Sequence, residues 1–135
     1  VIELAARLSG GYFCTHEIPL NTGVDLVGAA IRQSLGEEID PLELKPKFNR
    51  PVVQRYIFPN PGKVTSISYP KWIENDPNIC FFELRINKND IVKPILNHPA
   101  RAGVVITTGS EISEAIMKAE NVISSIKINT ENKGL

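Results

Sequence analysis

Three prolines in a short polar stretch divide this chain into two parts of unlike pattern. Pro41, Pro46 and Pro51 each remove a backbone donor and disfavour helix at the residue before them. Before this stretch the apolar residues recur with helical spacing, whereas after Gln54 they form short runs rich in β-branched and aromatic residues. The change of pattern predicts two domains, residues 1–50 and residues 51–135.

The first part is predicted to run strand, loop, helix. Residues 1–4 are an apolar run with one acid, which favours a strand, and glycines and a proline make residues 5–20 a long irregular loop. Asn21 or Thr22 is expected to cap a helix that ends at Gly36. The apolar stripe of this helix is Val24, Val27, Ile31 and Leu35.

The second part is predicted to be an antiparallel β structure. Residues 55–58 and 64–69 flank a turn with two prolines, which predicts a hairpin. The other elements expected from apolar runs and turn clusters are strands over 79–86, 91–92, 102–109 and 127–130, and a helix capped by Ser110. Because strands and helices are segregated along the chain, the fold class is α+β, with a β-rich subdomain closed by a C-terminal helix.

The helix after Ser110 carries a single apolar stripe, so we expect it to pack on a sheet. Lys118 lies on the opposite face of the predicted helix and should be exposed. Residues 131–135 are expected to fray. The stripe residues are Ile112, Ile116, Ala119, Ile123 and Ile126.

Composition excludes several function classes. Fifteen basic and fifteen acidic residues cancel, so no basic surplus points to nucleic acid or to an anionic membrane. No apolar run approaches the length of a membrane span. The two cysteines, Cys14 and Cys80, are far apart and form no C-x-x-C pair, so a zinc site is not expected. Their number and spacing indicate a reducing compartment, and we expect a cytoplasmic location.

The first residues combine an acid, a base and a glycine pair. In a strand Glu3 points away from its apolar neighbours, and burying its carboxylate is costly unless a cation or metal meets it. Arg7 and the amides of Gly10 and Gly11 suit anions. These residues fit the edge of a nucleotide–metal site, or simply a strand end with a Glu–Arg ion pair. The glycines form neither a P-loop nor a dinucleotide fingerprint.

A longer stretch carries a family resemblance. ELAARLSGG at residues 3–11, HEIP at 16–19 and TGVDLV at 22–27 resemble the closing segment of the ATP-grasp ligases. The likeness is greatest to the carboxylate–amine ligase branch, which includes the L-amino-acid ligases and is related to biotin carboxylase and carbamoyl-phosphate synthase. It is good over residues 1–36 and looser beyond, where the chain is similar to the C-terminal subdomain of these ligases.

The resemblance implies roles for particular residues, with ATP and Mg²⁺ as cofactors of the full-length parent. Glu3 would ligate the metal and Arg7 would be catalytic, contacting phosphate or an acyl-phosphate intermediate. The family pattern has Asn two residues after the Glu, but this chain has Ala5, which puts a second metal contact in doubt. The substrate-binding residues implied are Ser9, Gly10, Gly11 and His16.

The resemblance also implies that the chain is the C-terminal part of a larger ligase for small-molecule carboxylate and amine substrates. Residues 1–50 would then be the remnant of the ATP-grasp domain, and the isolated chain would be inactive. Two alternatives remain: a non-catalytic structural or oligomerisation module, and a subunit similar to biotin carboxylase or carbamoyl-phosphate synthase. Either a dimer, such as a homodimer, or a higher oligomer held partly through residues 1–36 is expected, or else disorder of those residues.

Three side chains, His16 among them, have both a functional and a structural interpretation. His16 is either a substrate-facing residue or a surface-loop histidine. Arg101 follows His98 and either binds a carboxylate or phosphate or forms a salt bridge at a strand end. Trp72 is expected to cover a sheet edge rather than to stack on a ligand.

Overall fold

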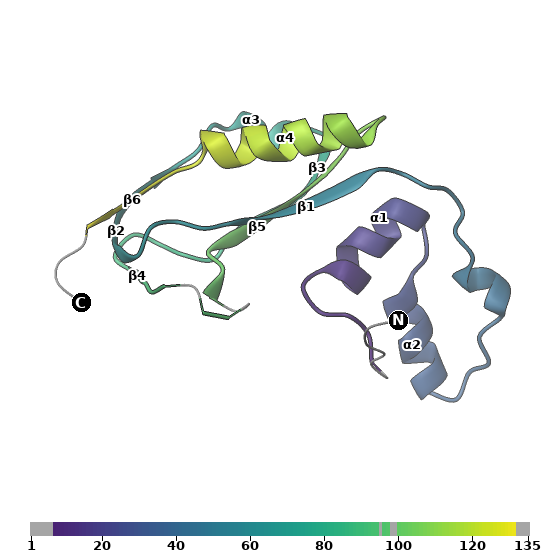
Figure 1. The fold of residues 1–135 in the computed structure, drawn as a ribbon. Coiled ribbons are helices and arrows are strands. Elements are labelled where there is room, and N and C mark those ends of the chain that lie inside the picture. The colour runs from purple at the N-terminus through teal and green to yellow at the C-terminus, as the bar shows by residue number, and fades with distance from the viewer. Residues whose placement is uncertain (1–6, 95, 98–99, 132–135) are drawn as a thin grey trace. The chain divides into compact units, whose positions relative to one another are not determined.

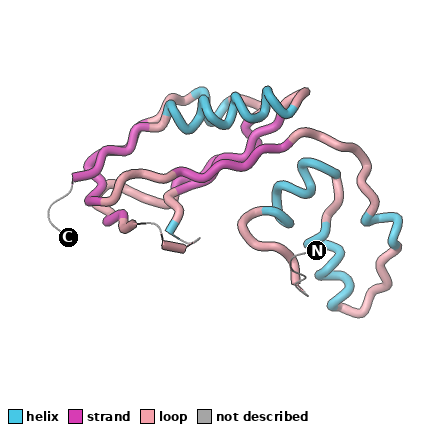
Figure 2. The backbone as a smooth tube through the Cα atoms, in the orientation of Figure 1, coloured by secondary structure: helices cyan, strands magenta, loops and turns pink. Residues whose placement is uncertain are grey.

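The computed structural model describes residues 7–94, 96–97 and 100–131. The chain forms two compact units, Val1–Val52 and Val53–Leu135, which are described separately. Figure 2 shows the helical character of the first unit up to the start of β1 and the strands that dominate the second.

The first unit contains a π-helical turn, Phe13–Glu17, then α1 (Ile18–Thr22), α2 (Leu26–Ser34) and a 3₁₀ turn, Pro41–Leu44 (Figure 1). The loop predicted for residues 5–20 is therefore wrong from Phe13 onward. Pro19 lies in the first turn of α1, where a helix needs no backbone donor, so it starts the helix rather than breaking it. Gly23 then ends α1 in the left-handed conformation at φ 74°.

The start of α2 also differs from the prediction. Its cap is Asp25, whose Oδ1 accepts from the Gly28 N–H at 2.8 Å, rather than Asn21 or Thr22. The predicted apolar stripe is only partly buried: Val24 is buried, whereas Ile31 is 56% and Leu35 is 74% exposed.

The second unit contains two three-stranded sheets. One has the order β1 (Val52–Ile57), β5 (Gly103–Thr108), β3 (Ile79–Leu84), and the other β4 (Ile91–Val92), β2 (Gly62–Ser68), β6 (Lys127–Glu131). The β3–β5, β2–β4 and β2–β6 pairs are antiparallel. Helices α3 (Trp72–Asn75) and α4 (Ile112–Ser125) accompany them (Figure 1). This confirms the predicted α+β class with antiparallel sheets, and β6 follows the closing helix.

The hairpin predicted between the first two strands is wrong. β1 and β2 belong to different sheets, and β1 pairs instead with β5, where the Ala102 N–H donates to Ile57 O at 3.2 Å. Pro59 and Pro61 explain the difference, because each fixes φ and lacks a donor, so the connection does not supply a tight reversal. The chain passes from one sheet to the other at this point.

The core of the second unit lies between α4 and the sheet around β5. Every residue of β5 is buried, and α4 packs against this strand. The cluster comprises Val53, Ile73, Val105, Ala115, Ala119 and Val122, with Ile79, Phe82, Ile116, Ile123 and Ile126 packed against it.

The predicted stripe of α4 is confirmed only in part. Ala119 is fully buried, but Ile112 is 53% exposed, and the centre of the buried face is shifted to Ala115 and Val122. Ser110 does not cap the helix, because the cap position belongs to Glu111. The Ser110 N–H and hydroxyl instead both donate to the Glu114 carboxylate, at 2.7 and 2.8 Å.

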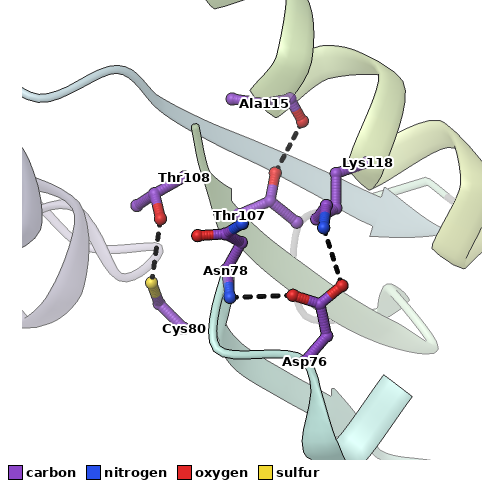
Figure 3. Close-up of polar contacts among 7 residues, drawn as sticks. All are labelled: Asp76, Asn78, Cys80, Thr107, Thr108, Ala115 and Lys118. Atoms are coloured by element: carbon purple, nitrogen blue, oxygen red, sulfur yellow. Dashed lines mark hydrogen bonds and ion pairs between the residues drawn. The ribbon is translucent and has the colours of Figure 1, made fainter. Parts of the chain in front are cut away.

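Polar contacts join α4 to β5 and to the connection between α3 and β3 (Figure 3). Buried Thr107 donates from Oγ1 to the Ala115 carbonyl at 2.7 Å, so the hydroxyl that β5 buries is satisfied by α4.

The prediction that Lys118 is exposed is wrong. Its Nζ lies 2.7 Å from Asp76 Oδ2, and the two side chains are only 23% and 20% exposed. Asp76 Oδ1 also accepts from the Asn78 N–H at 2.9 Å. The hydrogen bond from Lys118 Nζ lowers the pKa of Asp76.

We expect Val122→Ala to lower the free energy of unfolding by about 2 kcal/mol, because it removes two methyl groups from a fully buried site and leaves a cavity. Met117→Ala, at a position that is 57% exposed on the same helix, should change it by less than about 0.5 kcal/mol. Urea melts of both variants test this. Equal losses would mean that α4 does not pack as described.

Surface substitutions typically change the free energy of unfolding by less than about 0.5 kcal/mol. We expect Lys118→Met to lower it by more than this, because the variant leaves the half-buried Asp76 carboxylate without its cation. The Lys118 hydrogen bond lowers the folded-state pKa of Asp76, so the contribution of the pair is present above the unfolded-state pKa and is lost as pH falls through the folded-state value. The stability difference between wild type and variant should thus be constant from about pH 7 to 5 and shrink below about pH 4.

Urea melts across this pH range measure the difference. Glu114 is the other acid near Lys118; its pKa is lowered mainly by its hydrogen bonds with Ser110, which both proteins keep, and to a smaller extent by the charge of Lys118, which the variant lacks. Exposed Lys127→Met is the matched control and should follow the wild type at every pH. A difference that persists undiminished at pH 3 would contradict the assigned pair.

Candidate functional site

The segment that carries the predicted anion-binding residues lies at the surface of the first unit. Arg7, Ser9, Gly10 and Gly11 are all exposed, and the segment is irregular up to a turn at Gly10. The Arg7 Nη1 donates to the Leu8 carbonyl at 3.3 Å. A long bond to a neighbouring carbonyl leaves the guanidinium group accessible to an anion.

This segment enters the following helix through an unusual backbone. Gly11 and Tyr12 are both left-handed, at φ 69° and 74°, a conformation that is uncommon for a residue with a side chain. The next residues form the π-helical turn, in which the N–H groups of His16 and Glu17 both donate to the Tyr12 carbonyl, at 2.9 and 3.0 Å. The π turn holds its five residues in a register that an α-helix would not give them.

A pocket of about 320 Å³ lies beside this turn. Glu17 forms part of its wall, and the Oε2 atom is shielded from solvent and has no hydrogen-bond partner among the described residues. Burial raises the pKa of Glu17, because the charged carboxylate is partly desolvated. The pocket is lined by Phe13, Glu17, Ile18, Asn21 and Val52.

The chain that returns towards β1 supports this pocket. Its backbone N–H groups at Lys47 and Arg50 donate to the carbonyls of Thr22 and Asn21, at 2.8 and 2.9 Å. The Asn21 Nδ2 donates in turn to the Arg50 carbonyl and to Asn49 Oδ1. These bonds hold the end of α1 against the return segment and so fix Asn21 in the pocket wall.

Gly23 is required where the return segment crosses α1. A Cβ atom at this position would lie 2.8 Å from the Phe48 ring, and the backbone is left-handed. Both features favour glycine, so the Thr-Gly pair of the sequence motif has a packing role in this unit.

The predicted site residues are only partly brought together. Ser9, Gly10 and Gly11 are consecutive in the exposed segment, and His16 lies on the π turn edge-on to Tyr12, with ring centroids 5.3 Å apart. The His16 Nδ1 is 2.8 Å from Thr15 Oγ1. Glu3 and Ala5 lie outside the described residues, so the metal site and its relation to Arg7 stay predictions.

Sequence reasoning missed the pocket and Glu17. The spacing of a π turn has no recognised sequence period, so the residues it gathers are not apparent in the sequence. Pro19 two positions after Glu17 was the available signal, because proline is common in the first turn of a helix.

Arg101 and Trp72 both lie in the second unit. The Arg101 guanidinium stacks on the Tyr56 ring at 3.6 Å from its centroid. Trp72 begins α3 and is 41% exposed. His98 lies outside the described residues.

Two observations limit the kinds of site in the described part of the chain. No three His, Cys, Asp or Glu side chains converge there to hold a metal ion. None of the helices that the structure describes is long and apolar enough to cross a bilayer.

Comparison with solved structures shows a shared fold. Phosphoribosylglycinamide synthetase from Anaerococcus prevotii superposes with a TM-score of 0.69 at 22% identity, over 87% of this chain and 30% of the enzyme. L-amino acid ligase from Bacillus licheniformis gives a TM-score of 0.69 at 15% identity, over 91% of this chain and 32% of the enzyme. The chain thus spans about a third of the length of these two enzymes.

Comparison with protein families is more specific. No curated protein sequence matched the chain. The model of the family L-amino acid ligase C-terminal domain 2 matches residues 55–131, which is 77 of 135 residues and more than half of the chain. Together with the shared fold, this match confirms the resemblance to the C-terminal part of an ATP-grasp ligase. The chain belongs to the L-amino acid ligase C-terminal domain 2 family.

Proposed function

We propose that this chain is the C-terminal part of an ATP-dependent ligase that activates a carboxylate as an acyl phosphate and joins it to an amine. The observation that carries the proposal is the family match over residues 55–131, because it assigns the second unit to L-amino acid ligases. The first unit adds a motif whose acid, base and glycines suit a metal–phosphate site.

In this proposal Glu3 holds Mg²⁺ against the phosphates of ATP. Magnesium prefers carboxylate oxygens and keeps several waters, so a single protein carboxylate is a sufficient contribution from this segment. The role of Glu3 is supported by the sequence motif alone. When bound, the metal would offset the charge that develops during phosphoryl transfer.

Arg7 would stabilise negative charge on the transferring group. Its exposed guanidinium and the neighbouring exposed Ser9, Gly10 and Gly11 support this role, because a ligand can approach their polar groups without displacing protein. His16, on the turn that follows, would border the substrate site.

A second ligase class has some support from the fold. The phosphoribosylglycinamide synthetase superposes as well as the L-amino acid ligase does, and at higher identity. A fold is shared by enzymes with different substrates, so this likeness does not choose between them. The family match favours the L-amino acid ligase.

In the full-length ligase we expect Glu3→Gln to lower kcat by a factor on the order of one hundred or more, because the variant keeps the shape of the side chain but loses a metal charge partner. ATP-dependent amide formation with Mg²⁺ measures this. Exposed Glu38→Gln makes the same chemical change and should leave kcat unaltered. Activity within a few-fold of wild type in the Glu3 variant would make Glu3 a plain strand residue.

For the isolated 135-residue chain we expect no ATP hydrolysis and no binding of ATP–Mg²⁺ tighter than about 1 mM, or about 4 kcal/mol. The resemblance implies that residues 1–50 are only the remnant of the ATP-grasp domain, so the rest of the nucleotide site would be supplied by the parent ligase. Isothermal titration calorimetry tests this. Micromolar binding would show that these residues contain a nucleotide site of their own.

A further inference from the structure

The Glu17 carboxylate lacks the compensation that a partly buried charge requires. Its Oε2 atom is shielded from solvent without a hydrogen-bond partner, and the charge has no ion-pair partner among the described residues. A buried acceptor left unbonded costs free energy, and more when it is charged. Such a group is either a tolerated defect or one whose partner arrives with a ligand.

The backbone around Glu17 favours the second explanation. Glu17 is the last residue of the π-helical turn, and a left-handed Tyr12 precedes that turn; both conformations are costly and sparsely populated. An ordinary α-helical turn over the same residues would avoid the π register. Strained backbone that places an uncompensated acid in the wall of a pocket is the arrangement expected of a ligand site.

The pocket has a defined chemistry. Phe13, Ile18 and Val52 give it an apolar wall, and the lining contains no cationic side chain. Both hydrogen bonds of the Asn21 side chain use its Nδ2, so its Oδ1 is left as an acceptor. A carboxylate and an amide oxygen beside apolar groups suit a ligand with a cationic, hydrogen-donating end and an apolar body.

We propose that the Glu17 pocket binds the ammonium end of a small amine with an apolar side chain. Its volume of about 320 Å³ is at the lower end of the range for small-molecule sites, about 300–1,000 Å³, and so fits a compact ligand. That this amine is the acceptor substrate of the ligase rests on the proposed function. The binding of an amine to the pocket is independent of the proposed function, because binding requires neither ATP nor turnover.

The binding test uses the 135-residue chain at pH 7 and a matched pair of probes, 3-methylbutan-1-amine and 3-methylbutan-1-ol. The amine should shift the NMR signals of Phe13, Ile18 and Val52, and the alcohol should bind at least ten-fold more weakly. Glu17→Gln should weaken amine binding at least ten-fold, whereas exposed Glu38→Gln should not alter it. Equal binding of both probes, or no binding of the amine, would overturn the proposal.

A second measurement needs no variant. The pKa of the Glu17 carboxyl, followed by NMR in the wild-type chain, should fall when the amine is added, because a cation favours the charged form. His16 is the titratable residue next to Glu17 in the sequence. It is present in the titrations with and without the amine, so the comparison is made with the same neighbour in place. An unchanged pKa of Glu17 would show that the amine does not meet this carboxylate.

Turnover by the full-length ligase separates this proposal from the proposed function. Glu17→Gln should raise KM for the amine substrate at least ten-fold and leave KM for ATP unchanged. An active ligase without this effect would refute the Glu17 assignment alone. Amine binding by the chain together with a ligase that forms no amide would refute the proposed function and leave the pocket assignment standing.

Discussion

The second unit depends on the complete burial of β5. This strand lies between β1 and β3 in its sheet, and α4 covers one of its faces, so each of its side chains must fit a closed environment. Gly103 permits the close approach of β3, since a Cβ there would lie 2.5 Å from the Glu83 carbonyl. Thr107 is tolerated because its hydroxyl finds the Ala115 carbonyl.

The elements that bury a continuous apolar surface are the ones that the sequence predicted well. β3, β5 and α4 are apolar runs or stripes, and each lies within about two residues of its expected bounds, since hydrophobic periodicity reports burial directly. Strand pairing is not encoded in that way. β1 and β2 have the local pattern of a hairpin, but β1 gains more by pairing with buried β5, and tertiary context decides.

The candidate site likewise contains residues that the sequence predicted and one residue that it did not. Arg7 and the Gly10–Gly11 pair were predicted from residue chemistry and the family motif. The structure shows that they are exposed, and their role in ligand binding stays a prediction. Glu17 was not found, because the π turn that presents it follows no period visible in the sequence. Local strain is a property of the backbone, and it became apparent only once the dihedral angle of Tyr12 was known.

Two carboxylates show how the units differ. Lys118 lowers the pKa of Asp76, whose charge is met by the lysine and by the Asn78 N–H, and this acid ties α4 to the connection between α3 and β3. Burial raises the pKa of Glu17, whose charge nothing in the described chain meets. The same functional group thus has its charge stabilised in one unit and disfavoured in the other. A charge that the fold itself satisfies serves the fold, whereas one that it leaves unsatisfied at a pocket is available to a cation from outside.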